Sequence, residues 1–210
     1  MPLDRDLIGT WLTGWARARK VGVPVDQGDC WRVEIGWPSQ ARRFVFPLPS
    51  PQLSRLAQTI TDPLVYLKAF QAADAMQAQL PPGWVLEPQC AMMLLDVPDA
   101  PGHACPDGYR LQQQDGGIAR ILAGGAIVAG GQVAIENGLA VFVGIKVDAA
   151  HRRRGLGRIV MAALTAMARD AGVRQGALVA TPEGQALYRA LGWREYAPYI
   201  SAHPHDPIAP

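Results

Sequence analysis

The sequence has little of several features that would place a protein in a special class. Its 210 residues include three cysteines, Cys30, Cys90 and Cys105, without a Cys-x-x-Cys pair, which disfavours both a disulfide framework and a zinc site. No apolar run approaches the ~20 residues of a membrane span, and the first residues are not typical of a signal peptide. We therefore expect a reduced, cytoplasmic protein that binds neither metal nor membrane.

Excess charge of one sign is also missing. The chain has 20 basic and 18 acidic residues, for a net charge of +2. Lys20, Lys68 and Lys146 are the only lysines, so the other basic residues are arginines. Arginine suits bidentate phosphate binding, although genomic base composition equally explains the bias. The near-neutral total, with no second basic stripe, argues against a nucleic acid as partner.

Prolines and glycines cluster at one internal stretch, residues 96–108, which has three prolines and two glycines. Such a stretch does not hold a helix and is typical of a linker. It predicts an N-terminal α/β domain over residues 1–98 and a second domain over residues 105–202. The proline-rich residues 203–210 are expected to be a loose tail.

The second domain has a clear order of predicted elements. Asn137-Gly138 is the strongest turn signal, and it joins residues 132–136 to residues 139–143 as an antiparallel hairpin. Apolar spacing predicts a helix over residues 159–171, ended by Gly172. Thr181 and Pro182 are typical of the start of the next helix. Strands are expected at residues 109–113, 118–122, 126–135, 139–147, 176–181 and 193–201.

The most informative stretch follows the strand at residues 139–147. A strand, a glycine-bearing turn and a helix start point a row of backbone N–H groups and a positive helix end at one spot, which suits an anion. Two glycines keep Cβ atoms away from that spot, and four arginines add charged donors. The alternative is a basic helix start that binds nothing specific. The predicted anion site consists of Arg152, Arg153, Arg154, Gly155, Leu156, Gly157 and Arg158.

The Arg-x-x-Gly-x-Gly pattern of Arg152, Gly155 and Gly157 resembles the acyl-CoA pyrophosphate loop of the GNAT N-acetyltransferases. The ending Leu-Tyr-x-x-Leu-Gly-Trp at residues 187–193 is similar to a second mark of that family. The resemblance covers roughly residues 106–202. It implies an α+β fold, with a mostly antiparallel sheet flanked by helices, and the transfer of an acetyl group from acetyl-CoA to an amine.

The resemblance also implies roles for individual residues. The pantetheine arm would pair with the backbone of Ile145, Lys146 and Val147, and Thr181 would lie at the cofactor site. Tyr188 would protonate the departing thiolate; the alternative is a core aromatic on an amphipathic helix. The strand at residues 139–147 has no carboxylate to act as the base. Glu136 is the first choice, while a water relay or a base from the N-terminal half stays open.

One departure from the family concerns its first two helices, because only four residues separate Gln113 from Ile118. The N-terminal half repeats the order of the C-terminal half, with a Gly-Trp pair after its second helix. It is either a degenerate GNAT-like repeat without the glycine loop or an unrelated α/β domain. Its expected strands are residues 30–36, 42–48, 64–70 and 84–95, and its expected helices are residues 50–60 and 72–80.

The sequence therefore predicts an N-acyltransferase in which a neutral amine attacks acetyl-CoA directly. The alternative is a catalytically degenerate acyl-CoA-binding module that serves as a sensor or interaction partner. The acceptor amine is not readable from the sequence, and a monomer and a homodimer are both compatible with it.

Overall fold

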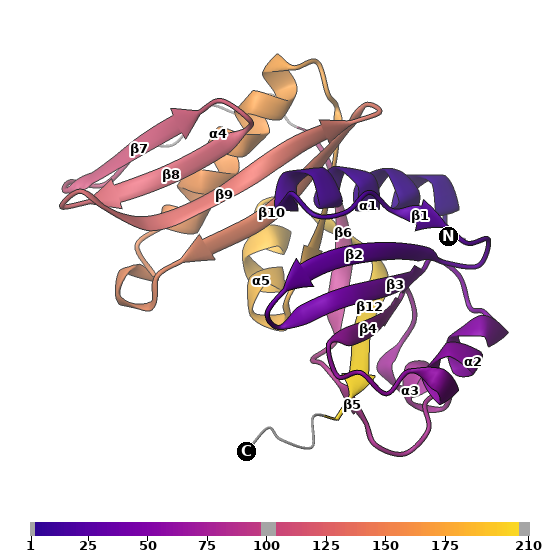
Figure 1. Cartoon of the computed structure of the whole chain (residues 1–210). Coiled ribbons are helices and arrows are strands. Elements are labelled where there is room, and N and C mark those ends of the chain that lie inside the picture. The colour runs from indigo at the N-terminus through magenta and orange to yellow at the C-terminus, as the bar shows by residue number, and fades with distance from the viewer. Residues whose placement is uncertain (1–2, 98–103, 206–210) are drawn as a thin grey trace. The chain divides into compact units, whose positions relative to one another are not determined.

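The computed structural model describes residues 3–97 and 104–205, and its elements are labelled in Figure 1. The described chain falls into two compact units. Unit 1 holds residues 3–93, 179–185 and 195–205, and unit 2 holds residues 94–97, 104–178 and 186–194. The units are therefore not the two consecutive stretches that the linker predicts. No helix in the described ranges is long and apolar enough to cross a membrane.

The sheet of unit 1 is mixed. In order, its strands are β1 (Val25–Asp26), β2 (Trp31–Trp37), β3 (Gln40–Phe46), β4 (Val65–Ala69) and β12 (Arg194–Pro204). The pair β3–β4 is parallel, with five registered residues, and the other neighbours are antiparallel. The last strand also pairs with β5 (Trp84–Leu86). This pairing explains why the C-terminal segment joins the N-terminal unit.

Helices cover the two faces of this sheet. The helices α2 (Pro51–Thr59) and α3 (Ala73–Gln77) lie over an apolar core that includes Phe44 and Leu67. On the opposite face lies α1 (Arg5–Arg19), whose Trp11 ring meets the rings of Phe70 and Tyr199 edge-on. The sequence interpretation did not anticipate α1, although Asp4 caps it by accepting from the N–H groups of its first turn.

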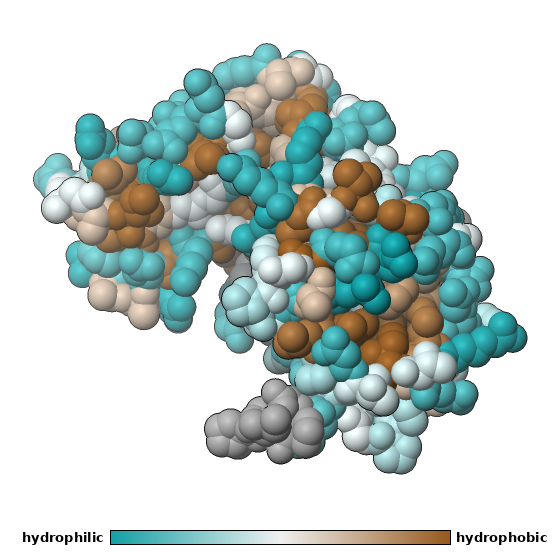
Figure 2. Space-filling model, viewed as in Figure 1, coloured by the Kyte–Doolittle hydropathy of each residue, from teal (hydrophilic) through white to brown (hydrophobic). Residues whose placement is uncertain are grey.

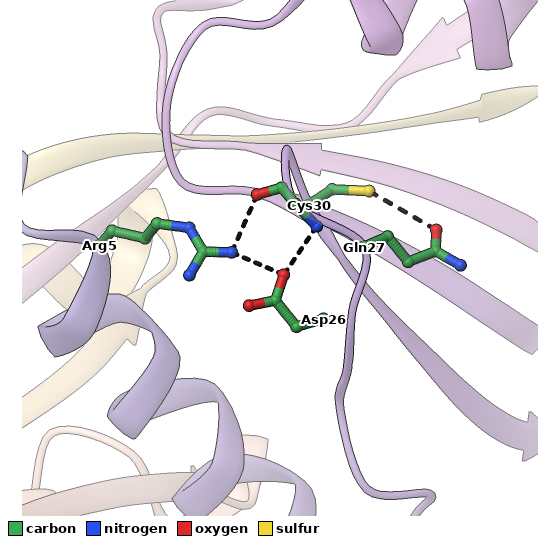
Figure 3. Close-up of polar contacts among 5 residues, drawn as sticks. Arg5, Asp26, Gln27 and Cys30 are labelled. Carbon is green, nitrogen blue, oxygen red and sulfur yellow. Dashed lines mark hydrogen bonds and ion pairs between the residues drawn. The ribbon is translucent and has the colours of Figure 1, made fainter.

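An ion pair and hydrogen bonds connect the start of α1 to the turn that follows β1 (Figure 3). The Arg5 guanidinium contacts a carboxylate oxygen of Asp26 at 2.7 Å and donates to the carbonyl of Gly28 at 2.9 Å. The same Asp26 oxygen accepts from the Gly28 N–H at 2.8 Å. These contacts lower the pKa of the Asp26 carboxyl, chiefly through the Arg5 hydrogen bond.

Unit 2 is built on a strand order of β11, β10, β9, β8 and β7. Only β10–β11 is parallel, so the predicted mostly antiparallel α+β fold is confirmed. The helix α4 (Leu156–Asp170) packs on one face of β8, β9 and β10 (Figure 1). The strands are β7 (Tyr109–Gln114), β8 (Ile118–Ala123), β9 (Ala126–Glu136), β10 (Leu139–Val147) and β11 (Gln175–Ala180).

The expected elements are found within a few residues, with two corrections. The run at residues 84–95 is two strands, β5 and β6 (Cys90–Asp96), because Pro88 interrupts it. The predicted loose tail, residues 203–210, includes residues of a strand, because β12 continues through Pro204. Residues 206–210 lie outside the described chain. The tight β7–β8 hairpin leaves no room for two helices, as expected. The predicted linker falls partly on residues 98–103, which also lie outside the described residues.

Both units repeat one sequence of elements. In unit 2, an antiparallel hairpin leads into α4, then into the parallel strand β11 and into α5 (Pro182–Ala190), whose residues divide between the units. In unit 1, the β2–β3 hairpin leads into α2, the parallel strand β4 and α3. The order and the direction of the strands therefore match.

Candidate active site

The two parallel strands of unit 2, β10 and β11, are paired over only part of their length. The register of β10 with β11 covers Leu139 to Val141. Beyond Val141, the described chain shows no further register pair between them, although β10 continues to Val147. The pair β3–β4 of unit 1, in contrast, stays in register through Phe46. A strand that leaves its neighbour presents backbone N–H and C=O groups to a ligand.

A β-bulge marks the same part of β10. The register with β9 shifts between Val143 and Lys146, so that three steps on β10 match two on β9. Gly144 lies in the bulge at φ +65°, a conformation that favours glycine. The strand is buried from Leu139 to Val143 and exposed at Gly144. The bulge therefore stands where the strand emerges from the core.

An open groove of about 200 Å³ lies beside this bulge. Gly144, Lys146 and Asp148 line it from β10 and the residue after it. Figure 2 shows the hydrophobic side chains of unit 2 exposed among hydrophilic ones, and Ile127 at the groove is 52% exposed. The remaining lining residues come from β9 and are Ile127, Val128, Ala129 and Gly130.

The glycine- and arginine-rich loop forms the expected turn into a helix. A short 3-10 turn, η1 (Ala149–His151), follows β10, and α4 begins at Leu156. Arg153 and Gly155 both have positive φ values, 62° and 76°. Gly155 stands at the N-cap position of α4 without a side chain to cap it. The helix start is thus left without an internal anionic or polar cap.

Backbone donors are free at this helix start. In the described chain, the first N–H in α4 with a backbone acceptor is that of Arg158, which donates to the Gly155 carbonyl. The N–H groups of residues 153–157 have no backbone acceptor there. The side chains of Arg152, Arg153, Arg154 and Arg158 are exposed around them. Free N–H groups, a helix dipole and four guanidinium groups together suit an anion.

Glycine is required at the two loop positions for different physical reasons. A Cβ added to Gly155 would meet open space, so that residue is needed for its left-handed backbone. A Cβ added to Gly157 would lie 3.1 Å from Leu187 Cδ2 and 3.7 Å from Val147 Cγ2. The expectation that Gly157 clears space for phosphate is therefore corrected: its missing side chain allows α5 to pack on the first turn of α4.

Tyr188 lies on α5, next to Leu187. Its ring is 8% exposed and stands 6.0 Å from that of Trp193, and burial raises the pKa of its phenol to about 12. Trp193 also meets Phe142 of β10 edge-on. The structure thus connects Tyr188 through Trp193 to the residue that follows the last β10–β11 register pair.

Two other predicted site residues lie at the ends of secondary-structure elements. Glu136 faces Leu139 at the closed end of the hairpin, whereas the loop follows Val147. Eight residue steps of strand separate those ends, which is about 27 Å at 3.4 Å per residue. Thr181 caps α5, where its hydroxyl accepts from the Gly184 N–H at 3.3 Å. Its place at the cofactor site stays a prediction.

Sequence reasoning did not predict the hydrogen bonds that hold the loop in place. His151, at the end of η1, makes a 3.0 Å hydrogen bond through Nδ1 with the hydroxyl of Tyr109 on β7, and the two rings meet edge-on. The Asp148 N–H donates to the Val128 carbonyl at 2.9 Å. Tyr109 is 42 residues from His151, so only the strand order could reveal this contact. No group of side chains in the described chain has the composition of a metal site.

Comparison with known proteins shows which sequences and folds this chain resembles. Residues 114–195 match the family model described as an acetyltransferase (GNAT) domain. A search of curated proteins finds no significant match. Among solved structures, the chain is similar to a GCN5-related N-acetyltransferase from Kribbella flavida, with 17% identity and a TM-score of 0.68. The similarity covers 100% of this chain and 97% of that one.

Two further structures share the architecture. A GCN5-related N-acetyltransferase from Sphaerobacter thermophilus is 13% identical, with a TM-score of 0.61 over 85% of this chain and 78% of that one. A tandem GNAT protein from the clavulanic acid biosynthesis pathway is 15% identical, with a TM-score of 0.57 over 86% and 79%. Such identities establish the fold alone. Residues 114–195 therefore match the GNAT domain model, and the chain has the fold of the GNAT N-acetyltransferases.

Proposed function

We propose that this protein is an N-acyltransferase that transfers an acetyl group from acetyl-CoA to an amine. The observation that carries the proposal is the uncapped start of α4 after the bulged part of β10, which pairs with β9 but has no register pair with β11. One feature suits a pyrophosphate and the other suits an extended amide-bearing arm. Both lie within the matched GNAT domain.

The loop would hold the pyrophosphate. The free N–H groups of residues 155–157 would donate to its oxygens, and the helix dipole favours its charge. The exposed side chains of Arg152, Arg153, Arg154 and Arg158 add charge-assisted donors. Arg152 already donates from Nε to the Val147 carbonyl at 3.4 Å, so it also braces the end of β10.

The bulge would hold the reacting end of acetyl-CoA. The pantetheine amides would pair with the backbone of Ile145 to Val147, where β10 has no register partner on β11. A backbone N–H at Ile145 or Lys146 would donate to the thioester oxygen, on which negative charge develops during attack. The groove at Gly144 gives an acceptor amine space beside that carbonyl.

The transfer would proceed by direct attack. The amine nitrogen forms a bond to the acetyl carbon, the carbon–sulfur bond breaks, and the amine loses one proton while the thiolate gains one. The Tyr188 phenol would supply the thiolate's proton. Because burial raises its pKa to about 12, the phenol stays protonated at neutral pH. The amine's proton would leave through water or through Asp148, the carboxylate at the groove.

A panel of primary amines incubated with acetyl-CoA and monitored by free-thiol release tests the proposal. Acetyl-CoA at 100 times its Kd should stabilise the fold by about 2.7 kcal/mol. Arg154→Glu should weaken that binding, since it sets a carboxylate against the anion. Arg110→Glu, an exposed change on β7, is the matched control. Binding without turnover of any amine would instead favour an acyl-CoA-binding module, and no binding would refute the site.

A further inference from the structure

Buried side-chain donors without acceptors gather in unit 1. In the described chain, four buried side-chain polar atoms have no hydrogen-bond partner, and all four are nitrogens of unit 1. Native structures rarely leave such groups unpaired, so each one requires an explanation. Arg32 Nε lies 3.4 Å from a carboxylate oxygen of Glu34, so the lack of an acceptor oxygen points to a missing anion only at the other three atoms. The four atoms are Trp11 Nε1, Arg32 Nε, Gln40 Nε2 and Arg43 Nε.

Two cationic side chains of unit 1 lie on the same face of its sheet. Arg43 on β3 is opposite Tyr66, and Lys68 on β4 is opposite Val45, so that both cations lie on the face covered by α1. Arg43 is only 6% exposed, and its guanidinium stacks on the Trp15 ring at 3.9 Å. Lys68 is partly buried and donates from Nζ to the Ser201 hydroxyl at 2.7 Å.

Neither cation has a carboxylate partner within the described residues. The contact of Arg43 is with the neutral Gln40 side chain, and that of Lys68 is with a neutral hydroxyl. Glu87, the carboxylate that acts on Lys68, pairs with His203. Burial, and then the charge of Arg43, lower the pKa of Lys68 to about 7. Two unpaired cations that repel one another in a desolvated place favour a bound anion.

Aromatic rings form the walls of this cluster. The Lys68 Nζ is 5.2 Å from the Tyr66 ring centroid and 5.9 Å from that of Tyr199. Trp11, which has one of the unpaired donors, meets the Tyr199 ring at 5.8 Å. A ligand at this place therefore meets charged donors on the sheet and flat apolar surfaces beside them.

We propose that unit 1 has a binding site for a small organic carboxylate, held between Arg43 and Lys68 and flanked by Tyr66 and Tyr199. A carboxylate fits better than a phosphate for one reason. Arg19, in the last turn of α1, is the α1 cation that acts on Arg43, so the helix end nearest the site is a carbonyl end. Helix C-terminal carbonyls repel a doubly charged anion. The site concerns unit 1 alone and does not rest on acetyl transfer.

Lysine reactivity gives a direct measurement, because the chain has three lysines that mass spectrometry can follow separately. The full chain is treated with an amine-acetylating reagent, with and without benzoate, at constant ionic strength set with chloride. A carboxylate at ten times its Kd should slow labelling of Lys68 about tenfold. Lys20 and Lys146 are internal controls and should keep their rates. Acetate and inorganic phosphate serve as further probes.

Variants connect the protection to the two cations. Arg43→Met should weaken the protection by benzoate roughly 10- to 100-fold, as expected for loss of a charged hydrogen bond. Arg42→Met is the matched control, because Arg42 is the next residue on β3, is exposed and pairs with Glu34. Arg43→Lys keeps the charge should Arg43→Met fail to fold. Unchanged Lys68 labelling in benzoate and acetate, stronger protection by phosphate, or equal effects of Arg42→Met and Arg43→Met would each overturn the proposal.

Discussion

The ring of Trp193 stands edge-on to the ring of Phe142, with centroids 5.2 Å apart and planes at 89°. Gly176 on β11 makes room for both rings, since a Cβ there would lie 3.0 Å from Phe142 and 3.2 Å from Trp193. Trp193 also meets Tyr188 edge-on at 6.0 Å. The aromatic contacts therefore fix Tyr188 with respect to the point at which β10 leaves β11.

Tyr188→Phe should lower kcat by about 10²- to 10⁴-fold, the usual value of a general acid, and leave KM for acetyl-CoA nearly unchanged. The ring and its contact with Trp193 remain, so only the proton donor is lost. Steady-state kinetics with a saturating amine measure the effect. Tyr196→Phe, which loses the hydroxyl that accepts from the Asp4 N–H in unit 1, is a control for removal of a hydroxyl. An unchanged kcat would identify Tyr188 as a packing residue.

Gly157→Val should destabilise the fold by about 1–3 kcal/mol, because an overpacked side chain meets Leu187. The change Leu187→Ala should relieve part of that cost in the double variant. Gly155→Val should also destabilise the fold through its positive φ, but Leu187→Ala should not relieve it. Urea denaturation of Leu187→Ala, the two glycine variants and the two double variants gives the coupling. Equal relief of both glycine variants would contradict the different roles inferred for the two glycines.

Much of this could be predicted from local patterns. The hairpin at Asn137-Gly138 and the glycine loop were recognised because turn chemistry depends on adjacent residues. The helix α1 was missed although Ile8, Trp11 and Leu12 have helical spacing, because Gly9 and Gly14 inside it lower helix propensity. The return of β12 to β4 and the Tyr109–His151 contact join distant residues. No local pattern contains such information, and the choice of Glu136 as the base, made without distances, stays a prediction.

Glu136→Gln should leave kcat unchanged. A general base must come within about 3 Å of the proton that it removes, whereas five residue steps of strand, about 17 Å, separate Leu139, the register partner of Glu136, from Gly144 at the groove. Asp148→Asn is the informative partner variant, because Asp148 lines the groove beside Gly144. The pH dependence of kcat/KM for both variants measures their roles. A large loss of kcat in Glu136→Gln alone would place the reacting centre at the closed end of the hairpin.

Stability should rise with pH between about 7 and 10 because of Lys68. Its pKa in the folded chain is about 7, lowered from 10.5 first by burial and then by Arg43, with Cys90 and Glu87 acting in the opposite direction. Across this pH window the unfolded chain therefore binds more protons than the folded chain. The stabilisation that this proton binding gives to the unfolded chain disappears as pH rises. Tyr199, whose pKa burial raises, stays neutral there. Lys68→Met should remove this rise in urea denaturation at several pH values, while Lys20→Met should keep it.

A chain that begins at residue 104 should be insoluble or unfolded. It would keep β12 but lose β4 and β5, which supply its register partners at Ile200 to Pro204. Ile200 and Ala202 are buried in the apolar core of unit 1, so truncation would expose them together with an unpaired strand edge. Expression and light scattering of the fragment, beside the full chain, measure the outcome. A second fragment that also ends at Arg194 removes the orphaned strand and is the matched control. A soluble, monomeric fragment 104–210 with a full melting transition would show that β12 does not need unit 1.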